Sequence, residues 1–186
     1  MERGPVYDTL RRLAGDLERE GLPYAILGGM AVVTHGYVRT TDDVDLVMTP
    51  ETLEAFRRLL VGRGYRPAFV GASRTFRDAE TGVRVEVIAS GEFPGDGKPK
   101  AVTFPDPEAA RIQQDGIWWI TLEKLLELKL ASGLTAPHRL KDLADVQELI
   151  LRNALSESLA EKLDPSVRDE YLRLWRGAQS APSIPE

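Results

Sequence analysis

The chain has 186 residues, of which 42% are apolar and 28% charged, with a net charge of −5 and no cysteine. This length and composition fit one globular domain, or a compact domain with a small appendage. The missing cysteines exclude disulfides, thiolate zinc sites and cysteine nucleophiles. The acidic balance argues against strong non-specific binding to nucleic acid, and no apolar run is long enough to suggest a membrane span. We therefore expect a soluble, cytoplasmic protein with no membrane partner.

The first third of the chain carries alternating helix and strand signals. Apolar residues recur at helical spacing near the N-terminus, and a glycine followed by Leu-Pro ends that pattern. A later helix has a threonine in the capping position and a proline in its first turn. Short apolar runs between these helices are typical of strands. The expected elements are a helix from Val6 to Leu17, a strand at 24–27, a short helix up to Gly36, a strand at 43–48 and a helix from Pro50 to Leu60.

Further along, the hydrophobic period changes to two and then returns to helical spacing. Three valines alternate with Arg84 and Glu86, and the preceding "AETG" supplies a turn, so we expect a β-hairpin. A loop rich in glycine and proline follows at 91–107, with room for one short strand, and "GIWWI" is the expected last strand. Helices are expected from Thr121 to Ser132, from Pro137 to about Asn153, and after Ser156 and Pro165, before a frayed tail at 180–186.

Together these elements predict an α+β fold, a mixed β-sheet flanked by helices with a C-terminal helical subdomain. We expect residues 1–116 to form the main core. Residues 117–186 would add the last strand and the helical subdomain packed on that core.

The strand "DVDLVM" carries two acidic residues inside an apolar run. Because successive side chains on a strand point to opposite faces, Asp43 and Asp45 share one face, roughly 7 Å apart along the chain, while Val44 and Leu46 share the other. Two like charges so close favour a bound cation, and Mg²⁺ prefers such hard oxygen ligands. The alternative is a hydrated strand face that ends in a charged turn.

Two further signals precede and follow this strand. Gly28 and Gly29 connect a strand to a helix, where free backbone N–H groups can bind phosphate, although a tight turn explains them as well. Glu86 lies between apolar residues of a later strand, where it is either a third acidic ligand or a solvent-facing residue. Asp78, in the preceding strand of the hairpin, is the alternative third carboxylate.

The C-terminal helices carry basic residues in unexpected places. Lys129 falls near the centre of an apolar arc, so its ammonium either reaches solvent at the helix end or points at the phosphate oxygens of a bound ligand. On the next helix Arg139 is expected on the inward side, Lys141 and Asp145 as an exposed ion pair, and Asp142 at the border, able to orient a basic residue. The expected apolar arc of that helix consists of Leu140, Leu143, Ala144, Val146, Ile150 and Leu151.

The front motif resembles the signature of the nucleotidyltransferase superfamily, which includes DNA polymerase beta and poly(A) polymerase. That signature is a Gly-Gly or Gly-Ser pair, followed about a dozen residues later by acidic-hydrophobic-acidic on the next strand, and a third carboxylate further on. Gly28, Gly29, Asp43, Asp45 and Glu86 match it. The resemblance implies a catalytic core with a two-metal Mg²⁺ site at the three carboxylates and an NTP as substrate.

The resemblance extends from about Tyr24 to Ile150. Within the superfamily, the chain most resembles the AbiEii-like toxin nucleotidyltransferases. It implies transfer of a nucleoside monophosphate to a hydroxyl acceptor (an RNA end, a protein or a small molecule) and a cognate toxin or antitoxin as a possible partner. The alternative is a non-catalytic antitoxin or nucleotide-binding module with the same fold. The residues that match, with an implied role in nucleotide binding or its support, are Arg39, Thr41, Lys129, Arg139, Lys141, Asp142 and Asp145.

Overall fold

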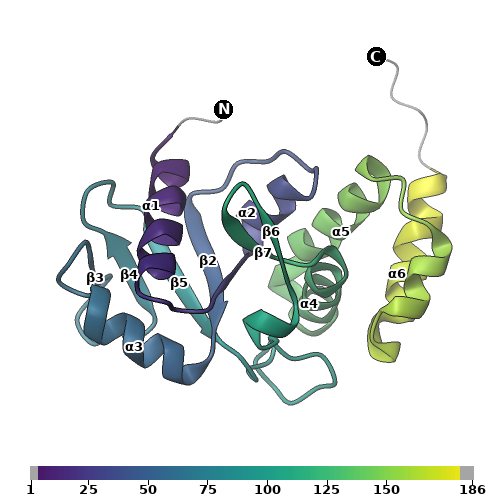
Figure 1. Cartoon of the computed structure of the whole chain (residues 1–186). Coiled ribbons are helices and arrows are strands. Elements are labelled where there is room, and N and C mark those ends of the chain that lie inside the picture. Colours follow the sequence, from purple (N-terminus) through teal and green to yellow (C-terminus); the bar gives the residue numbers. More distant parts are fainter. Residues whose placement is uncertain (1–3, 181–186) are drawn as a thin grey trace.

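The structure, a computed structural model, describes residues 4–180, so the tail at 181–186 lies outside the described residues. Helices and strands alternate in the first half, and helices dominate the end of the chain (Figure 1). The α-helices are α1 (Pro5–Arg19), α2 (Gly28–Thr34), α3 (Pro50–Leu60), α4 (Leu122–Thr135), α5 (Leu140–Arg152) and α6 (Pro165–Gln179). The strands are β1 (Ala25–Leu27), β2 (Asp43–Met48), β3 (Tyr65–Pro67), β4 (Thr75–Asp78), β5 (Arg84–Ala89), β6 (Arg111–Gln114) and β7 (Ile117–Ile120). The 3₁₀ turns are η1 (Pro107–Ala109), η2 (Pro137–Arg139) and η3 (Glu157–Lys162).

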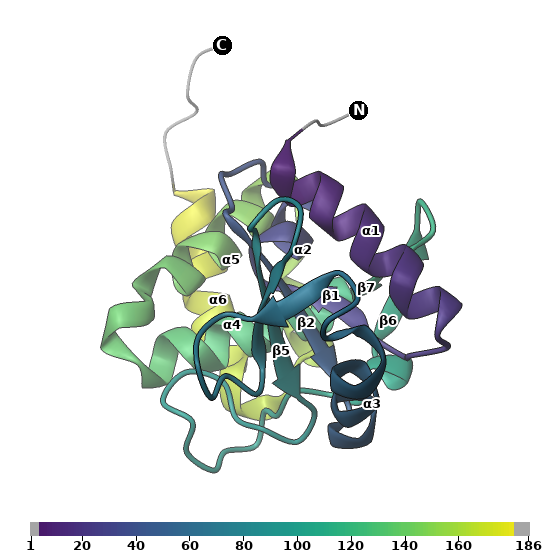
Figure 2. The ribbon, with the colours of Figure 1, turned by 90° about the vertical axis from the view of Figure 1, so that its left-hand side faces the viewer.

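One seven-stranded mixed sheet organises the molecule, in the order β3-β4-β5-β2-β1-β7-β6. Strands β2 and β5 run parallel at its centre, as do β1 and β7, while the remaining neighbours are antiparallel. The predicted mixed sheet flanked by helices is therefore confirmed. Figure 2 shows α1 and α3 on one side of the sheet and α4, α5 and α6 on the other.

Local sequence explains where the central elements begin. Helix α3 starts at Thr49-Pro50 as predicted, because the Thr49 hydroxyl accepts a hydrogen bond from the Thr52 amide at 3.2 Å. Strand β2 buries Val44 and Leu46 completely and leaves Asp43 and Asp45 partly exposed. The predicted alternation of this strand is correct.

The hairpin of β6 and β7 corrects the sequence prediction, which left room for one short strand in the loop at 91–107 and expected only "GIWWI" after it. The structure has no strand between 91 and 107 and instead pairs β6 with β7. Asp115 and Gly116 join them with φ values of 52° and 76°. An Asp-Gly pair with both φ values positive is the favoured two-residue hairpin turn, and this dipeptide was the overlooked signal.

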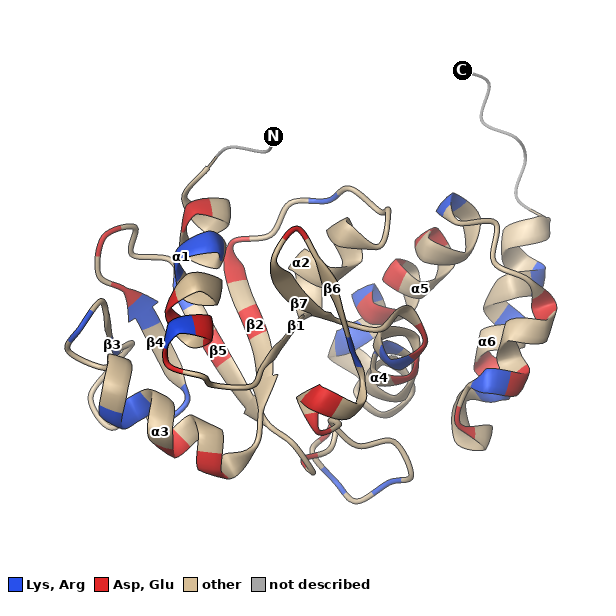
Figure 3. Cartoon of the chain, viewed as in Figure 1, with Lys and Arg blue, Asp and Glu red and all other residues tan. Residues whose placement is uncertain are grey.

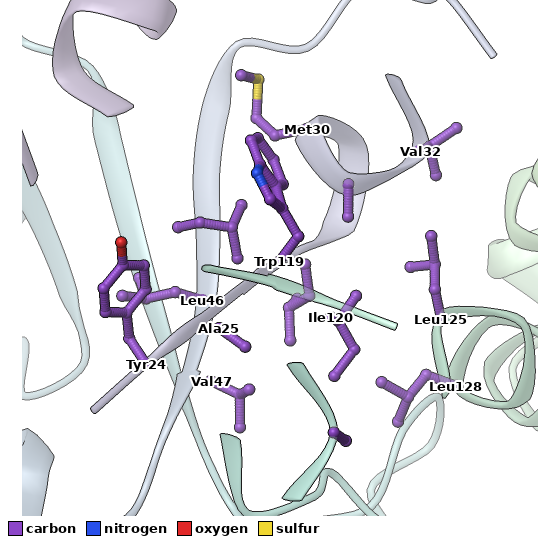
Figure 4. Packing of buried hydrophobic residues seen from close by; sticks show 14 of the residues in the cluster. Tyr24, Ala25, Met30, Val32, Leu46, Val47, Trp119, Ile120, Leu125 and Leu128 are labelled. Carbon is purple, nitrogen blue, oxygen red and sulfur yellow. The ribbon is translucent and has the colours of Figure 1, made fainter. Parts of the chain in front are cut away.

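The core lies between the sheet and its helices, and Figure 4 shows its central part. Leu125 and Leu128 of α4 extend toward Ile120 of β7, while Met30 of α2 lies beside Trp119. This packing fixes α4 against the sheet next to the turn at Gly28. The same cluster contains residues on both sides of position 116, and the predicted division there falls within the β6–β7 hairpin. The two-part division stays a prediction.

Helix α5 buries a different arc from the predicted one. Leu140 and Leu151 are 66% and 43% exposed, whereas Leu149 is fully buried. The inward side also includes Asp142 and Asp145, at 2% and 4% exposure. These two carboxylates can be buried because basic side chains form ion pairs with them. Within residues 4–180, no helix combines the length and the apolarity needed to cross a membrane.

Candidate functional site

Three carboxylates lie side by side on one face of the central strands. Asp43 and Asp45 point from β2 to the side opposite Val44 and Leu46, and Glu86 of β5 is the direct cross-strand partner of Asp45. In Figure 3 the acidic colouring is visible on β2 and β5. The pairing of two parallel strands has thus brought together residues that are 41 positions apart in sequence.

The electrostatics of this face are unfavourable for a bare carboxylate. Burial raises the pKa of Asp45, and the like charges of Asp43 and Glu86 raise it as well. Arg84 and Lys129 lower it by less, so the pKa is about 7. Glu86 itself is ion-paired with Arg84, two residues earlier on the same face. Arg84 was not predicted as a site residue, although its place in the alternation with Glu86 was the available signal.

The glycine pair lies directly against this face. Gly28 has a φ of +64°, and a Cβ on it would lie 2.1 Å from the Asp45 Oδ2. A Cβ on Gly29 would lie 2.6 Å from the Thr41 Oγ1 and 3.1 Å from an Arg39 Nη. Both positions therefore need glycine because the turn is packed against the acidic strand and the segment before it.

Lys129 has a role that neither sequence alternative contained. Its ammonium, in a side chain 8% exposed, donates to Asp142 Oδ1 at 2.9 Å and to Asp145 Oδ2 at 2.7 Å, both on α5. The Ser132 hydroxyl donates to the other oxygen of Asp142 at 2.7 Å. The buried lysine thus joins α4 to α5, and Asp142 orients a basic residue as predicted.

The predicted surface pair between Lys141 and Asp145 is wrong. Asp145 is buried and meets Lys129 from α4 and Arg39, whose Nε lies 3.3 Å from Asp145 Oδ1, while Lys141 stays exposed. Arg139 is also more exposed than predicted, because the helix begins only after it, and its Nε donates to Asp142 at 2.9 Å. Arg39 Nε is buried and, in the described part of the chain, has no hydrogen-bond partner of suitable geometry.

A cleft of about 570 Å³ collects most of these residues. Asp145 stands behind the cleft wall rather than in it, and Asp78 is far from it: that carboxylate is fully buried and held by Arg12 at 2.6 Å. The cleft is also lined by residues that sequence reasoning missed, among them Asp42 and Gly95. The predicted residues that line it are Gly28, Gly29, Arg39, Thr41, Asp43, Asp45, Glu86, Lys129, Arg139, Lys141 and Asp142.

Solved structures with the same arrangement of elements are nucleotidyltransferases or proteins assigned as such. The antibiotic-resistance factor ANT(2'')-Ia is 15% identical, with a TM-score of 0.58, over 93% of this chain and 97% of that one. A candidate nucleotidyltransferase of Thermotoga maritima is 16% identical, with a TM-score of 0.53, over 74% and 89% of the two chains. A nucleotidyltransferase-like antigenic protein of Paracoccidioides brasiliensis is 18% identical, with a TM-score of 0.52, over 77% and 74%.

This chain has the nucleotidyltransferase fold. No protein-family model matches the sequence, and no curated protein matches it either. The similarity to AbiEii-like toxins in particular stays a prediction.

The acidic face of this nucleotidyltransferase fold fits a hard divalent cation by its chemistry. Asp43, Asp45 and Glu86 offer only carboxylate oxygens. Burial first, and the charges of Asp43 and Glu86 after it, raise the pKa of Asp45, and a cation beside it would favour its ionised form. As the side chains stand, no three or more His, Cys, Asp or Glu residues within 4–180 form a group that could hold a metal ion. Glu86 is turned to Arg84, so binding a cation would require it to exchange partners.

Proposed function

We propose that this protein is a Mg²⁺-dependent nucleotidyltransferase that moves a nucleoside monophosphate from an NTP to a hydroxyl acceptor. One observation carries the proposal: the pairing of β2 with β5 sets Asp43, Asp45 and Glu86 on one face of a cleft. The same cleft contains the Gly28-Gly29 turn. Phosphoryl transfer depends on positioning and charge compensation. Acidic residues beside a glycine turn and several basic side chains can supply both.

Each residue has a distinct part in the proposed reaction. Asp43, Asp45 and Glu86 would hold Mg²⁺, which would supply electrophilic activation of the α-phosphate. The acceptor oxygen bonds to the α-phosphorus, the bond to the bridging oxygen breaks, and pyrophosphate leaves. Glu86, the third carboxylate of this face, would either complete the metal site or accept the hydroxyl proton.

The basic side of the cleft would bind the triphosphate. Arg39 brings a buried Nε without a hydrogen-bond partner among the described residues, and Arg139 and Lys141 bring exposed cations at the start of α5. Thr41 and the backbone of Gly28 and Gly29 would add hydrogen bonds to phosphate oxygens. Lys129, Asp142 and Asp145 would act from behind, by holding α5 and Arg39 in place.

The rival function is that of a non-catalytic antitoxin or nucleotide-binding module. Such a protein would bind NTP without needing Mg²⁺, whereas the proposed transferase requires Mg²⁺. ANT(2'')-Ia has also been solved in complex with adenylyl-2''-tobramycin. This supports the reaction type for the fold. The acceptor of this chain, and a cognate toxin or antitoxin, stay predictions.

The deciding experiment incubates the protein with each α-labelled NTP, Mg²⁺ and a panel of acceptors: RNA, DNA, protein and aminosugars. We expect label on one acceptor class, and a loss of about 10³-fold in Asp43→Asn/Asp45→Asn, because metal activation is worth several kcal/mol. Glu51→Gln/Glu54→Gln removes the same charge from exposed positions of α3 and should transfer normally. Transfer that survives loss of both aspartates, or NTP binding indifferent to Mg²⁺ without any transfer, would reject the proposal in favour of the rival.

A further inference from the structure

Strands β3, β4 and β5 form one half of the sheet, and one of the two faces of this half is not covered by a helix. Tyr65, Phe76 and Val85, on β3, β4 and β5, are at most 1% exposed, so they belong to the covered face. Residues next to them alternate to the opposite face, where Arg66 and Arg84 are exposed and Arg77 is partly buried. Asp43, Asp45 and Glu86 belong to this same open face.

The arginines on this face stand in one straight cross-strand line. Arg66 of β3 is the direct partner of Arg77 of β4, Arg77 is the partner of Arg84 of β5, and Arg84 is the partner of Asp43. We call Arg66, Arg77 and Arg84 the arginine row. With neighbouring strands about 4.8 Å apart, the row spans about 10 Å and ends at the carboxylates of the candidate site.

Such a row is unexpected on grounds of stability. Like charges directly opposite each other on neighbouring strands repel, and this acidic chain places six arginines and no Asp or Glu between positions 55 and 77. Only part of the charge is compensated: Arg84 pairs with Glu86, and Arg77 donates to the Gly82 carbonyl at 2.8 Å. Within residues 4–180, the side chain of Arg66 takes part in no ion pair or hydrogen bond. An anion along the row would offset the repulsion.

We propose that the arginine row binds the phosphodiester backbone of a single-stranded nucleic acid, and that the terminal hydroxyl of this strand is the acceptor. This inference rests on the proposed function. Three cations in line match a repeating anion, with phosphate contacts that position the strand without reading its sequence. A polycationic aminosugar would be repelled by the same row. The cleft of about 570 Å³ has the size of a site for one small ligand such as the NTP, so the strand would lie outside it along the row and reach its edge with the terminal hydroxyl.

The test measures binding apart from transfer. In the Asp43→Asn/Asp45→Asn background, the full chain is titrated against a 5′-labelled oligouridylate and an oligothymidylate of equal length over a series of salt concentrations. We expect Arg66→Ala/Arg77→Ala to weaken binding at every salt concentration. The slope of log K against log salt should become shallower by about 1.4, because two contacts to single-strand phosphates are lost. The two oligonucleotides distinguish RNA from DNA as the source of the backbone, and row-dependent binding of either supports the proposal.

Two further variants guard the result. Arg57→Ala/Arg58→Ala removes the same charge from α3, on the far side of the sheet, and should leave the slope unchanged. Arg66→Lys/Arg77→Lys keeps the charge and should keep the slope, which separates lost contacts from lost folding. Equal losses in the row and α3 variants, or no loss in either, would overturn the proposal.

The same proteins separate this inference from the proposed function. If oligonucleotides bind through the row but neither they nor any other acceptor takes label in the wild-type protein, the transferase proposal fails. The assignment of the acceptor then fails with it, and only the binding of the backbone by the row stands. If an aminosugar or a protein takes the label while oligonucleotides do not bind, the transferase proposal stands and the row is overturned.

Discussion

Two regions of this molecule place a pair of aspartates on one face of an element, with opposite electrostatic results. On α5, burial alone would raise the pKa of Asp142, but the Lys129 ammonium, with Ser132 and Arg139, lowers it below its usual value. On β2 burial also raises the pKa of Asp45, and the carboxylates of Asp43 and Glu86 add to this rise, so that the pKa reaches about 7. The α5 aspartates are compensated by ion pairs within the chain, whereas in the described residues those of β2 form none and Arg84, next to them, pairs with Glu86.

This difference separates scaffold from chemistry. The compensated pair on α5 joins this helix to α4, and its negative charge is neutralised by the Lys129 ammonium. The uncompensated pair on β2 retains repulsion that a bound cation would relieve, as expected where function rather than stability places the charge.

The largest effect is expected for Lys129→Met. This change leaves Asp142 and Asp145 buried without their shared cation, and breaking a buried ion pair in this way costs about 3–5 kcal/mol. Urea unfolding would measure it. Arg152→Met removes an exposed cation that pairs with Glu148 on the same helix and should cost less than about 1 kcal/mol. An equally small loss for Lys129→Met would show that the α5 pair needs no compensation.

Asp45→Asn should stabilise the protein, and only at higher pH. A carboxyl whose folded pKa lies near 7, against an ordinary 3.8, favours folding in its protonated form, so its penalty appears as pH rises from about 4 through 7. The substitution removes that penalty. With EDTA present, we expect the free energy of unfolding to rise by about 2–4 kcal/mol at pH 8 and by less than about 1 kcal/mol at pH 4.

Asp8→Asn on the exposed face of α1 serves as the control and should show no such pH dependence. A destabilised Asp45→Asn protein at pH 8 would mean that the β2 face is already compensated.

These two regions also show what the sequence could and could not predict. Period-two alternation was sufficient to place Asp43 and Asp45 together and to bury Val44, since that pattern is set within one strand. The partners of Lys129 were not predictable, because the α4–α5 contact depends on tertiary packing and an aspartate at helical spacing looks the same paired or solvated. Leu140 was assigned to the wrong side for a related reason: α5 begins after η2, so the first residues do not face the core. The Asp-Gly turn of β6–β7 was readable and was missed.

Gly28→Ala should cost more than an equivalent change at another glycine with the same backbone geometry. Gly28 and Gly82 have φ values of +64° and +73°, but a Cβ would meet Asp45 Oδ2 at 2.1 Å in the first case and nothing within 4 Å in the second. We expect about 1–2 kcal/mol for Gly82→Ala from the left-handed backbone alone and about 1 kcal/mol more for Gly28→Ala. Thermal unfolding of the two variants gives the difference. Equal costs would mean that the Asp45 side chain moves away freely.

Arg39→Gln should produce the smallest change in stability. Arg39 lies between the α5 aspartates and the β2 aspartates, and its Nε forms no hydrogen bond to either pair. Its Nε lies 3.3 Å from Asp145 Oδ1 without forming a hydrogen bond, and it is a buried donor left unsatisfied. Removing such a donor relieves a desolvation cost while losing a weak ion pair, so the unfolding free energy should change by less than about 1 kcal/mol. If the vacant Nε serves a triphosphate oxygen, the KM for NTP should nevertheless rise about tenfold, the value of one charged hydrogen bond. Arg57→Gln on α3 should leave that KM unchanged. A large loss of stability with an unchanged KM would instead assign Arg39 to the scaffold with Lys129.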